Sequence, residues 1–381
     1  MLLNYCKDEL GVGYEGMMLS ESLFAVAIVV LDVPTGWISD VWKRKYALAL
    51  GAALNVGGLL VLLSAKGLPG LILSQMIFGV GIALFNGTHT ALLYDTLLSL
   101  GREDEYRRRE GKRQALGLYG IAFAGVMGGF MYEQNHFLPI LLSIASYTAV
   151  FIVAVFMREP ERHKRTERHD PFGDIAKTMR YVLQGHQEVG LIILMAAALY
   201  CTTKNVMWTQ QPYYIALHLP PLVQGALMSC GWLLGGLSSH MAHRLDGRVN
   251  NFRALLVALA VVFLFCMGAG IYLGYQGIFF LVVGGSCIYG AMSPRVNEII
   301  NRNVDSSRRA TLLSTQTFLS SLFFIPVSNS VGLITDRTSI APGLLANAAW
   351  VFVLTAALFL WKRGPALQML KADAPATPHT H

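Results

Sequence analysis

Two apolar segments of this chain are joined by the stretch Asp32-Val33-Pro34-Thr35-Gly36-Trp37-Ile38-Ser39-Asp40-Val41-Trp42-Lys43-Arg44-Lys45. The segments on either side, Met17–Ile38 and Tyr46–Ala65, are each about 20 residues long, the length a helix needs to cross the hydrocarbon core of a bilayer. The end of the stretch is a short basic loop between them. The pattern predicts two membrane-spanning helices joined by that loop.

The composition of the whole chain also indicates a membrane protein. Of its 381 residues, 54% are hydrophobic and 14% are charged, against about 25% charged in soluble domains. A soluble protein would need polar helix faces to meet water, and the stretch Ala254–Ile271 has none. Apolar runs and their breakers define eleven candidate spans: Met17–Ile38, Tyr46–Ala65, Leu71–Leu93, Gln114–Met131, Phe137–Phe156, Val189–Ala216, Leu222–Met241, Ala254–Leu273, Ile278–Pro294, Ala310–Leu333 and Gly343–Leu360.

Positive charge is concentrated on one side of these spans, because alternate connections hold nearly all of the lysines and arginines. Cytoplasmic connections retain such residues, so we expect the basic side and the C-terminus in the cytoplasm and the protein in the inner membrane. The net charge of +7 then reflects topology, and we expect no nucleic-acid partner. The opposite side holds only Lys7, Lys66 and Arg337.

The spans fall into two groups. The longest connection, 158–188, is polar and basic, so we expect an N-terminal bundle over 1–157 and a C-terminal bundle over 189–361. Within that connection, Asp174–Gln184 suits an interfacial helix, with a solvated linker as the alternative. The tail 362–381 is short and rich in alanine and proline, and we expect it to be disordered.

A partial copy of the first basic loop follows the seventh span. The stretches Gly36–Lys45 and Gly236–Arg244 share glycine, serine and arginine at matching spacing. Glycine lets neighbouring helices approach, Asp40 ends its helix at the cytosol, and the basic residues hold the inner surface. Chance similarity between two positive loops is the alternative to an internal repeat.

These loops resemble the signature of the major facilitator superfamily, whose pattern is G-x-x-x-D-x-x-x-R-K. Asp32–Gly36 resembles the acidic-x-P-T-G lead-in of that family, and Arg309–Ser314 resembles its R-A-T-x-x-S before the eleventh helix. The resemblance implies two pseudo-symmetric helical bundles that rock about a central site. It assigns a cytoplasmic gating motif to Gly36, Asp40, Arg44, Lys45, Gly236 and Arg244.

The chain departs from the family pattern in four places. The family has twelve helices, and Met1–Tyr5 is only the end of a first one; a gene start upstream is favoured over a shortened chain. Lys43 replaces the usual glycine of the signature loop. Gln75 stands where proton-coupled members often carry arginine, and a neutral amide cannot tune a carboxylate in the same way. Ala124–Gly129 lacks the proline of many exporters, which weakens the case for export.

Polar side chains inside predicted spans are costly in lipid and are therefore candidates for transport. In the third span, Asn86, His89 and Thr90 follow i, i+3 and i+4 spacing, so a continuous helix would place them on one face. His89 can take a proton near neutral pH, and packing against a neighbouring helix is its alternative role. Asp32 is the one acidic residue well inside a predicted span, and it is a candidate for binding the coupling proton or for fixing the bend at Pro34.

The sixth span carries a second polar stripe, formed by Tyr200, Lys204, Trp208 and Gln211. We interpret it as a cavity wall in which Lys204 attracts an anionic group and Trp208 stacks on a ring or covers a cation. The alternative is that both residues reach the outer membrane surface. Asp95, near the cytoplasmic end of the third span, is predicted to make a gate or surface contact.

The sequence therefore predicts a secondary active transporter of a small organic molecule, working by alternating access, coupled to protons and with efflux slightly favoured. Walker, H-E-x-x-H and G-x-S-x-G motifs are absent, so we expect no enzyme activity, and no cofactor or metal. We expect a monomer whose partners are its substrate, the lipid bilayer and protons. A receptor or assembly factor built on a transporter scaffold is the alternative.

Overall fold

The computed structural model describes residues 1–86, 88–159, 187–242, 250–302 and 306–371. Within these residues, ten helices are long and apolar enough to cross a membrane. The predicted all-α membrane fold is therefore confirmed. The chain divides into two compact units: unit 1 is Met1–Asp170 with Pro221–Ala226, and unit 2 is Pro171–Pro220 with Leu227–His381.

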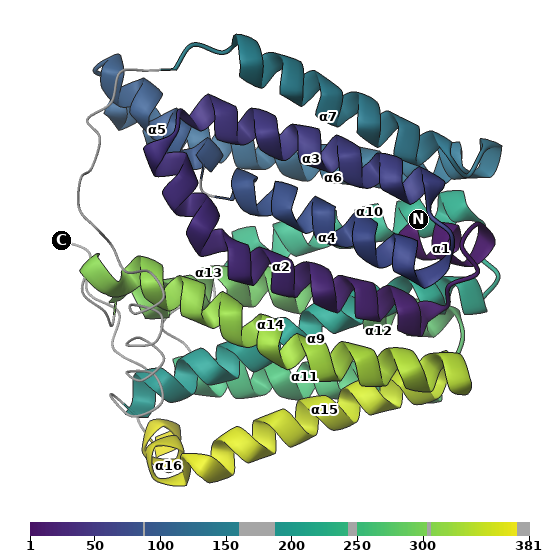
Figure 1. Cartoon of the computed structure of the whole chain (residues 1–381). Helices are drawn as coiled ribbons and strands as arrows, with labels where there is room; N and C mark the ends of the chain where they lie inside the picture. Colours follow the sequence, from purple (N-terminus) through teal and green to yellow (C-terminus); the bar gives the residue numbers. More distant parts are fainter. Residues whose placement is uncertain (87, 160–186, 243–249, 303–305, 372–381) are drawn as a thin grey trace. The chain divides into compact units, whose positions relative to one another are not determined.

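The helices follow the predicted spans closely (Figure 1). One predicted span, Leu222–Met241, forms a helix but lies outside the set of ten. Unit 1 contains α1 (Leu2–Asp8), α2 (Tyr14–Val41), α3 (Arg44–Ser64), α4 (Gly67–Phe85), α5 (Thr88–Ser99), η1 (Glu103–Glu105), α6 (Tyr106–Gln134) and α7 (Leu138–Phe156). Unit 2 contains α9 (Gln187–Ala216), most of α10 (Pro221–Met241), α11 (Asn251–Ile271), α12 (Tyr275–Val282), η3 (Val283–Cys287), α13 (Ile288–Arg302), α14 (Ser306–Arg337), α15 (Ile340–Trp361) and α16 (Arg363–Lys371).

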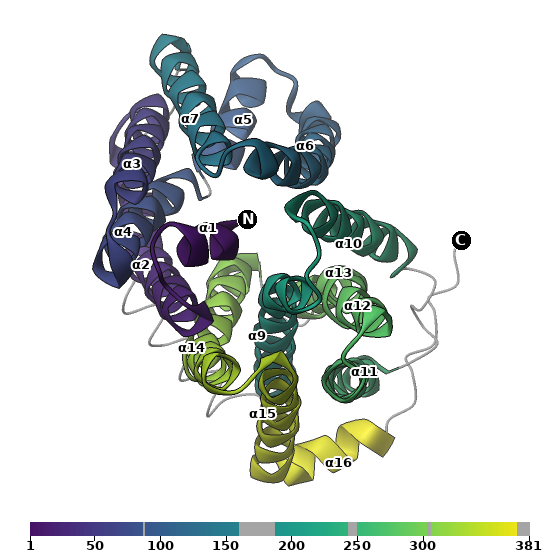
Figure 2. The same cartoon turned by 90° about the vertical axis from the view of Figure 1, so that its right-hand side faces the viewer.

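Helix α4 forms the centre of the packing in unit 1, with α2 on one side and α3 on the other (Figure 2). A Cβ atom on Gly81 would lie 2.1 Å from the side-chain oxygen of Asn55, so only glycine allows α3 and α4 to approach this closely. On the other side, Thr35 donates a hydrogen bond from Oγ1 to the carbonyl of Ala83, at 3.1 Å. Thr35 directly follows Pro34, and its Oγ1 also lies 2.7 Å from the Leu31 carbonyl. The threonine side chain thus adds a hydrogen bond within α2 at the point where proline lacks a backbone N–H donor.

The third predicted span is not one continuous helix. The sequence predicted it over Leu71–Leu93, but α4 ends at Phe85 and α5 begins at Thr88. Asn86 is the C-terminal cap of α4 with φ −56° and ψ 124°, a backbone conformation outside the helical region. Asparagine followed by glycine is a strong turn signal, and here it outweighs the apolar pattern that continues on both sides.

Unit 2 packs around α9, which lies against α14, α15 and α11. A chain of buried polar side chains ties three of these helices together. Asn205 of α9 donates to the side-chain oxygen of Asn347 of α15 at 2.9 Å, and Asn347 donates to the Sγ of Cys266 in α11 at 3.4 Å. Side-chain hydrogen bonds of this kind hold helices together in lipid, where apolar contact alone gives little preference for one neighbour.

Large apolar side chains project from α6 and α7 of unit 1. Phe156 is 81% exposed, and Leu116 and Phe123 are each 69% exposed. A water-soluble protein rarely exposes this many large apolar side chains on neighbouring helices. These faces fit lipid, since the backbone groups of both helices are bonded internally.

The end of the chain differs from the prediction. The sequence predicted disorder over 362–381, but Arg363–Lys371 forms α16, whose Ala366 and Met369 are buried. The side chain of Asn250 donates to the carbonyl of Met369 at 3.2 Å, which fastens α16 beside the start of α11. The interfacial helix predicted over Asp174–Gln184 lies outside the described residues, as does most of the predicted linker.

Two adjacent tyrosines on α9 offer a test of this packing. The hydroxyl of Tyr213 donates to the carbonyl of Gly274 at 2.9 Å and accepts from the backbone N–H of Gly274 at 3.0 Å. The hydroxyl of Tyr214 is buried with no hydrogen-bond partner among the described residues. We expect Tyr213→Phe to destabilise the protein by about 1–2 kcal/mol, and Tyr214→Phe to be neutral or stabilising. Thermal unfolding of the two variants in one detergent measures the difference, and equal melting temperatures would contradict it.

Candidate functional site

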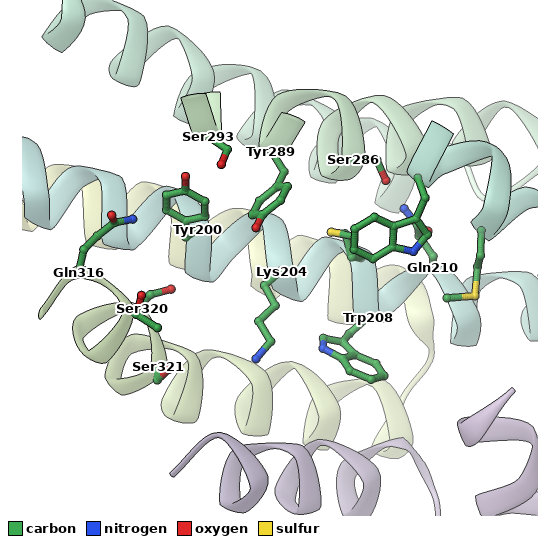
Figure 3. A pocket seen from close by; sticks show the side chains of 14 residues that line it. Tyr200, Lys204, Trp208, Gln210, Ser286, Tyr289, Ser293, Gln316, Ser320 and Ser321 are labelled. Carbon is green, nitrogen blue, oxygen red and sulfur yellow. The ribbon is translucent and has the colours of Figure 1, made fainter. Parts of the chain in front are cut away.

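A cavity of about 690 Å³ lies within unit 2 (Figure 3). Its wall comes from four parts of the unit: α9, α10, α14 and the run from η3 into α13. Aromatic, amide and hydroxyl side chains form most of the lining, with one lysine. The lining residues are Tyr200, Lys204, Met207, Trp208, Gln210, Met228, Trp232, Ser286, Tyr289, Ser293, Gln316, Thr317, Ser320 and Ser321.

The structure places most of the predicted stripe of α9 on this cavity. Tyr200, Lys204 and Trp208 line it, whereas Gln211 is buried outside the lining and Gln210 lines the cavity instead. The side chain of Gln210 donates to the carbonyl of Leu281 at 3.2 Å. Pro212 lies inside α9 just beyond these residues, and proline breaks the helical hydrogen-bond ladder and bends the helix. The helical period counted from Tyr200 therefore does not predict correctly that Gln211 lines the cavity.

Lys204 carries the positive charge of the cavity wall. Its Nζ lies 4.2 Å from the centre of the Phe324 ring on α14, a cation–π contact inside unit 2. Figure 3 shows its side chain beside Trp208, one turn along α9, with Tyr289 pointing toward it. The lysine thus lies in the cavity, as the cavity-wall interpretation of the stripe requires.

The other end of the cavity contains a tyrosine network that links three helices. Tyr200 shares side-chain hydrogen bonds with Ser293 of α13 and Gln316 of α14. Its ring meets that of Tyr289 edge to face, with centroids 5.3 Å apart. These contacts fix the orientation of two hydroxyl groups, so this end of the cavity presents hydrogen-bonding groups in set directions.

A short π-helical turn, η3, forms part of the wall and was not predicted from the sequence. Ser286 lies in this turn and lines the cavity. A Cβ atom on Gly235 of α10 would lie 2.8 Å from the carbonyl oxygen of Ser286, so the turn needs a glycine opposite it. Ser238 donates a hydrogen bond from its Oγ to the backbone carbonyl of Cys287 at 2.9 Å, so this carbonyl of the turn has a hydrogen-bond partner. Such turns are rare and are frequent at functional sites.

Gly236, the glycine predicted to belong to the second gating motif, does not make the close contact with η3. Gly236 is the counterpart of Gly36, and a Cβ atom added to it would meet no described atom within 4 Å. The residue of α10 that lies close to the turn η3 is its neighbour, Gly235. Arg244 lies outside the described residues, and neither the surroundings of Gly36 nor the side chain of Asp40 is described. The gating role assigned to these residues is thus an untested prediction.

Unit 1 holds a buried acidic residue that the sequence interpretation missed. Glu21 of α2 is 4% exposed, and its Oε1 accepts a hydrogen bond from Nε2 of Gln75 in α4 at 2.7 Å. The statement that Asp32 is the one acidic residue well inside a span is therefore wrong. The sequence predicted that this span starts at Met17, four positions before Glu21. Helix α2 begins earlier, at Tyr14, so Glu21 lies further inside the helix than predicted.

The other predicted candidates of unit 1 do not form one site. Asn86 is exposed at the end of α4, and His89 lies beyond the break, in α5. The Nδ1 of His89 is 2.7 Å from the carbonyl of Phe85, the last residue of α4. The shared helical face expected for Asn86, His89 and Thr90 is therefore absent, because the helix is interrupted between them. The side chain of Asp32 lies outside the description.

The basic loop after α2 forms a compact cluster at one end of unit 1. Arg44 makes a salt bridge with Asp95 of α5, and both side chains are largely buried. The carboxylate of Glu159 accepts hydrogen bonds from the backbone N–H groups of Arg44 at 2.8 Å and Lys45 at 2.9 Å, which caps the start of α3. Lys45 donates in turn to the carbonyl of Met157 at 3.2 Å, beside the end of α7. We name these four residues, Arg44, Lys45, Asp95 and Glu159, the basic-loop cluster.

An exposed ion-pair network follows α5. Arg102 and Arg109 each contact the carboxylate of Glu105, at 2.6 and 3.0 Å. Hydrogen bonds from these two arginines lower the pKa of Glu105. The group is solvent-exposed, so we assign it no part in the candidate site.

Comparison with known proteins agrees with this architecture. A curated relative, the uncharacterised MFS-type transporter YxaM of Bacillus subtilis (strain 168), is 21% identical over 86% of this chain and 82% of its own length. Among solved structures, the nucleoside transporter NupG has a TM-score of 0.72 at 16% identity, covering 98% of this chain and 94% of its own. A D-xylose–proton symporter has a TM-score of 0.70 at 11% identity, covering 92% of this chain and 87% of its own. The family model of the Major Facilitator Superfamily matches residues 1–328, and the chain belongs to this family of multi-pass small-molecule transporters.

Proposed function

We propose that this protein is a secondary active transporter that moves a small organic molecule by alternating access, in exchange with protons. The cavity of unit 2 is the observation that carries the proposal. Its volume of about 690 Å³ falls in the range of about 300–1,000 Å³ that is typical of small-molecule sites. Its lining joins apolar and aromatic walls to a few polar groups, the composition that binds and orients such ligands.

Glu21 supports the coupling to protons. An acidic side chain that is 4% exposed in a membrane-spanning helix is rare and is normally functional, so Glu21 is a default candidate for carrying a proton. Its hydrogen bond from Gln75 holds the group in place in either protonation state, since the amide donates to an oxygen that carries no proton. We assign the coupling proton to Glu21 ahead of Asp32 and His89.

The basic-loop cluster supports the proposed orientation. Positive residues gather at the end of unit 1 where α2 meets α3 and where α7 ends, and such residues are retained in the cytoplasm. We place this end, and the C-terminus, on the cytoplasmic side of the inner membrane. Proton influx then drives substrate outward, the direction that the sequence slightly favoured.

A flux measurement tests the proposal. The purified chain is placed in liposomes that contain a pH-sensitive dye, and uridine, D-xylose and indole-3-acetate are added in turn as probes. We expect at least one probe to change the lumenal pH with saturable kinetics, because its movement exchanges with protons. Protein-free liposomes and probe added without a membrane potential serve as controls.

Direction is measured in inside-out membrane vesicles, where an exporter accumulates the probe when the lumen is acidified. Accumulation under the opposite gradient would reverse the proposed direction. A folded protein that moves none of the probes and no protons would contradict transport, and would favour a receptor or assembly factor on the same scaffold.

A further inference from the structure

We propose that the end of unit 2 where α11 begins and α15 ends binds an anionic phospholipid of the surrounding bilayer. Arg363 holds the phosphate of this lipid, and its acyl chains lie on the exposed faces of α11 and α15. The site is separate from the cavity, and lipid binding there does not depend on the transport function.

An apolar strip runs along α11 and α15, which are antiparallel. Gly270, near the end of α11, lies against Leu345, near the start of α15. Farther along, the rings of Phe263 and Phe352 have centroids 6.4 Å apart, so the two helices adjoin there as well. Exposed side chains recur about two turns apart on each helix and form the strip: Val257, Leu264, Phe352, Val353 and Leu360. Acyl chains fit such a strip, but every phospholipid supplies them, so the strip alone selects no headgroup.

Helix α16 lies across one end of this strip. The chain leaves the helical conformation at Lys362, with φ −114° and ψ 41°, and α16 begins at the next residue. Figure 2 shows α16 running from the end of α15 toward α11, and the side chain of Asn250 donates to the carbonyl of Met369 at 3.2 Å. Ala366 and Met369 are buried in the core of unit 2. The start of α16, with Arg363, is therefore held in a set place.

The charge at this end of the strip selects the headgroup. Helices α11, α15 and α16 contain no aspartate or glutamate. Arg363 is exposed and lies two residues beyond the membrane span that ends at Trp361, which is the depth of the lipid headgroups. A guanidinium group binds phosphate through two parallel hydrogen bonds. The ammonium group of a zwitterionic lipid would meet no carboxylate on these helices, so an anionic headgroup is favoured.

Trp361 lies between the apolar strip and Arg363. Its side chain is 54% exposed, and the Nζ of Lys362 lies 4.9 Å from the centre of its ring. Tryptophan is enriched at this depth because its ring is apolar and its N–H group can donate a hydrogen bond. Leu360, Trp361 and Arg363 thus follow one another in the order of the acyl, glycerol and phosphate parts of a phospholipid.

Quenching of tryptophan fluorescence by brominated lipids tests the proposal. The full-length protein is reconstituted in bilayers of phosphatidylcholine with a small, rising fraction of either phosphatidylglycerol or phosphatidylcholine that carries bromine near the start of one acyl chain. Trp361→Phe is measured in parallel, so that the difference between the two proteins reports Trp361. We expect the brominated phosphatidylglycerol to reach half-maximal quenching at a mole fraction at least about threefold lower than the brominated phosphatidylcholine.

Variants then assign the preference to Arg363. We expect Arg363→Gln to abolish the difference between the two lipids, and Arg363→Lys to retain part of it, because lysine keeps the charge but loses the paired hydrogen bonds. Arg337→Gln is the matched control and should leave the preference unchanged. Arg337 is also an exposed arginine at a helix end, but it ends α14 at the opposite end of unit 2, just before α15 begins.

The native protein alone decides the headgroup preference, whether or not a variant folds. Equal quenching of Trp361 by the two lipids would overturn the proposal. A preference that survives Arg363→Gln, in a variant with the native melting temperature, would also overturn it. If neither lipid quenches Trp361 and the protein crosslinks as a dimer through this face, a second copy of the chain covers the strip and the proposal is wrong.

Discussion

Replacing Glu21 with glutamine is expected to abolish accumulation against a gradient while leaving exchange of substrate across the membrane intact. Glu21 is buried in α2 and accepts a hydrogen bond from Gln75. Glutamine has the same shape and retains an oxygen at the position that accepts this bond, but it cannot gain or lose a proton. The substitution therefore removes the protonation step and preserves the contact between α2 and α4.

The expected effect is large because coupling requires the proton to be bound in one state of the transporter and released in the other. Without it, the carried probe equilibrates across the membrane, and accumulation falls at least tenfold, to the level reached without a pH gradient. Counterflow with substrate on both sides needs no net proton movement and should continue. Both rates are measured in proteoliposomes with the probe that the native protein carries.

Two variants serve as comparisons for Glu21→Gln. Glu15→Gln changes the same residue type at an exposed position on the same helix, and it should leave accumulation unchanged. Asp32→Asn tests the coupling residue that the sequence suggested. If Asp32→Asn stops accumulation and Glu21→Gln does not, the assignment of the proton to Glu21 is wrong.

The second large effect is expected at the basic-loop cluster. Arg44→Asp would place two carboxylates together where Arg44 now pairs with Asp95, at side-chain exposures of 12% and 20%. Breaking a buried pair costs about 3–5 kcal/mol, and partial exposure reduces this to about 2–4 kcal/mol. We expect a clear fall in the melting temperature and at least a tenfold loss of flux.

The reciprocal substitution provides the control. Arg44→Asp combined with Asp95→Arg restores opposite charges, and it should recover part of the stability lost in the single variant. Arg109→Asp breaks an exposed pair with Glu105 and should change stability by less than about 1 kcal/mol. If the single and double variants melt together, the pairing of Arg44 with Asp95 is not what stabilises this end of unit 1.

The membrane fold could be predicted from the sequence because its strongest signals are local. Apolar length and the placement of lysine and arginine depend on one segment at a time, so they located the spans and the basic loop. The break at Asn86 was missed because the apolar pattern on both sides outweighed a two-residue turn signal. Helix α16 was missed for a similar reason: its composition suggested disorder, while the contact with Asn250 that stabilises it is made by a distant part of the chain.

The candidate site was only partly predictable because its members come from several helices. The period of α9 identified Lys204 and Trp208 together, since residues of one helix have a known register. Trp232, Tyr289 and Gln316 also line the cavity, but each lies on another helix whose rotation the sequence does not reveal. Glu21 was missed by an error of about one turn in the predicted start of its helix.

The π-helical turn η3 also bears on how related transporters diverge. A π turn holds one residue more than an α turn, so removing one residue from Val283–Cys287 would leave an ordinary α turn, with the two flanking helices close to their present orientation. Side chains inside the turn, such as Ser286, would then take new positions, whereas those beyond it, such as Tyr289, would keep theirs. Gain or loss of a single codon in this segment is thus a short evolutionary route to a cavity with different contents.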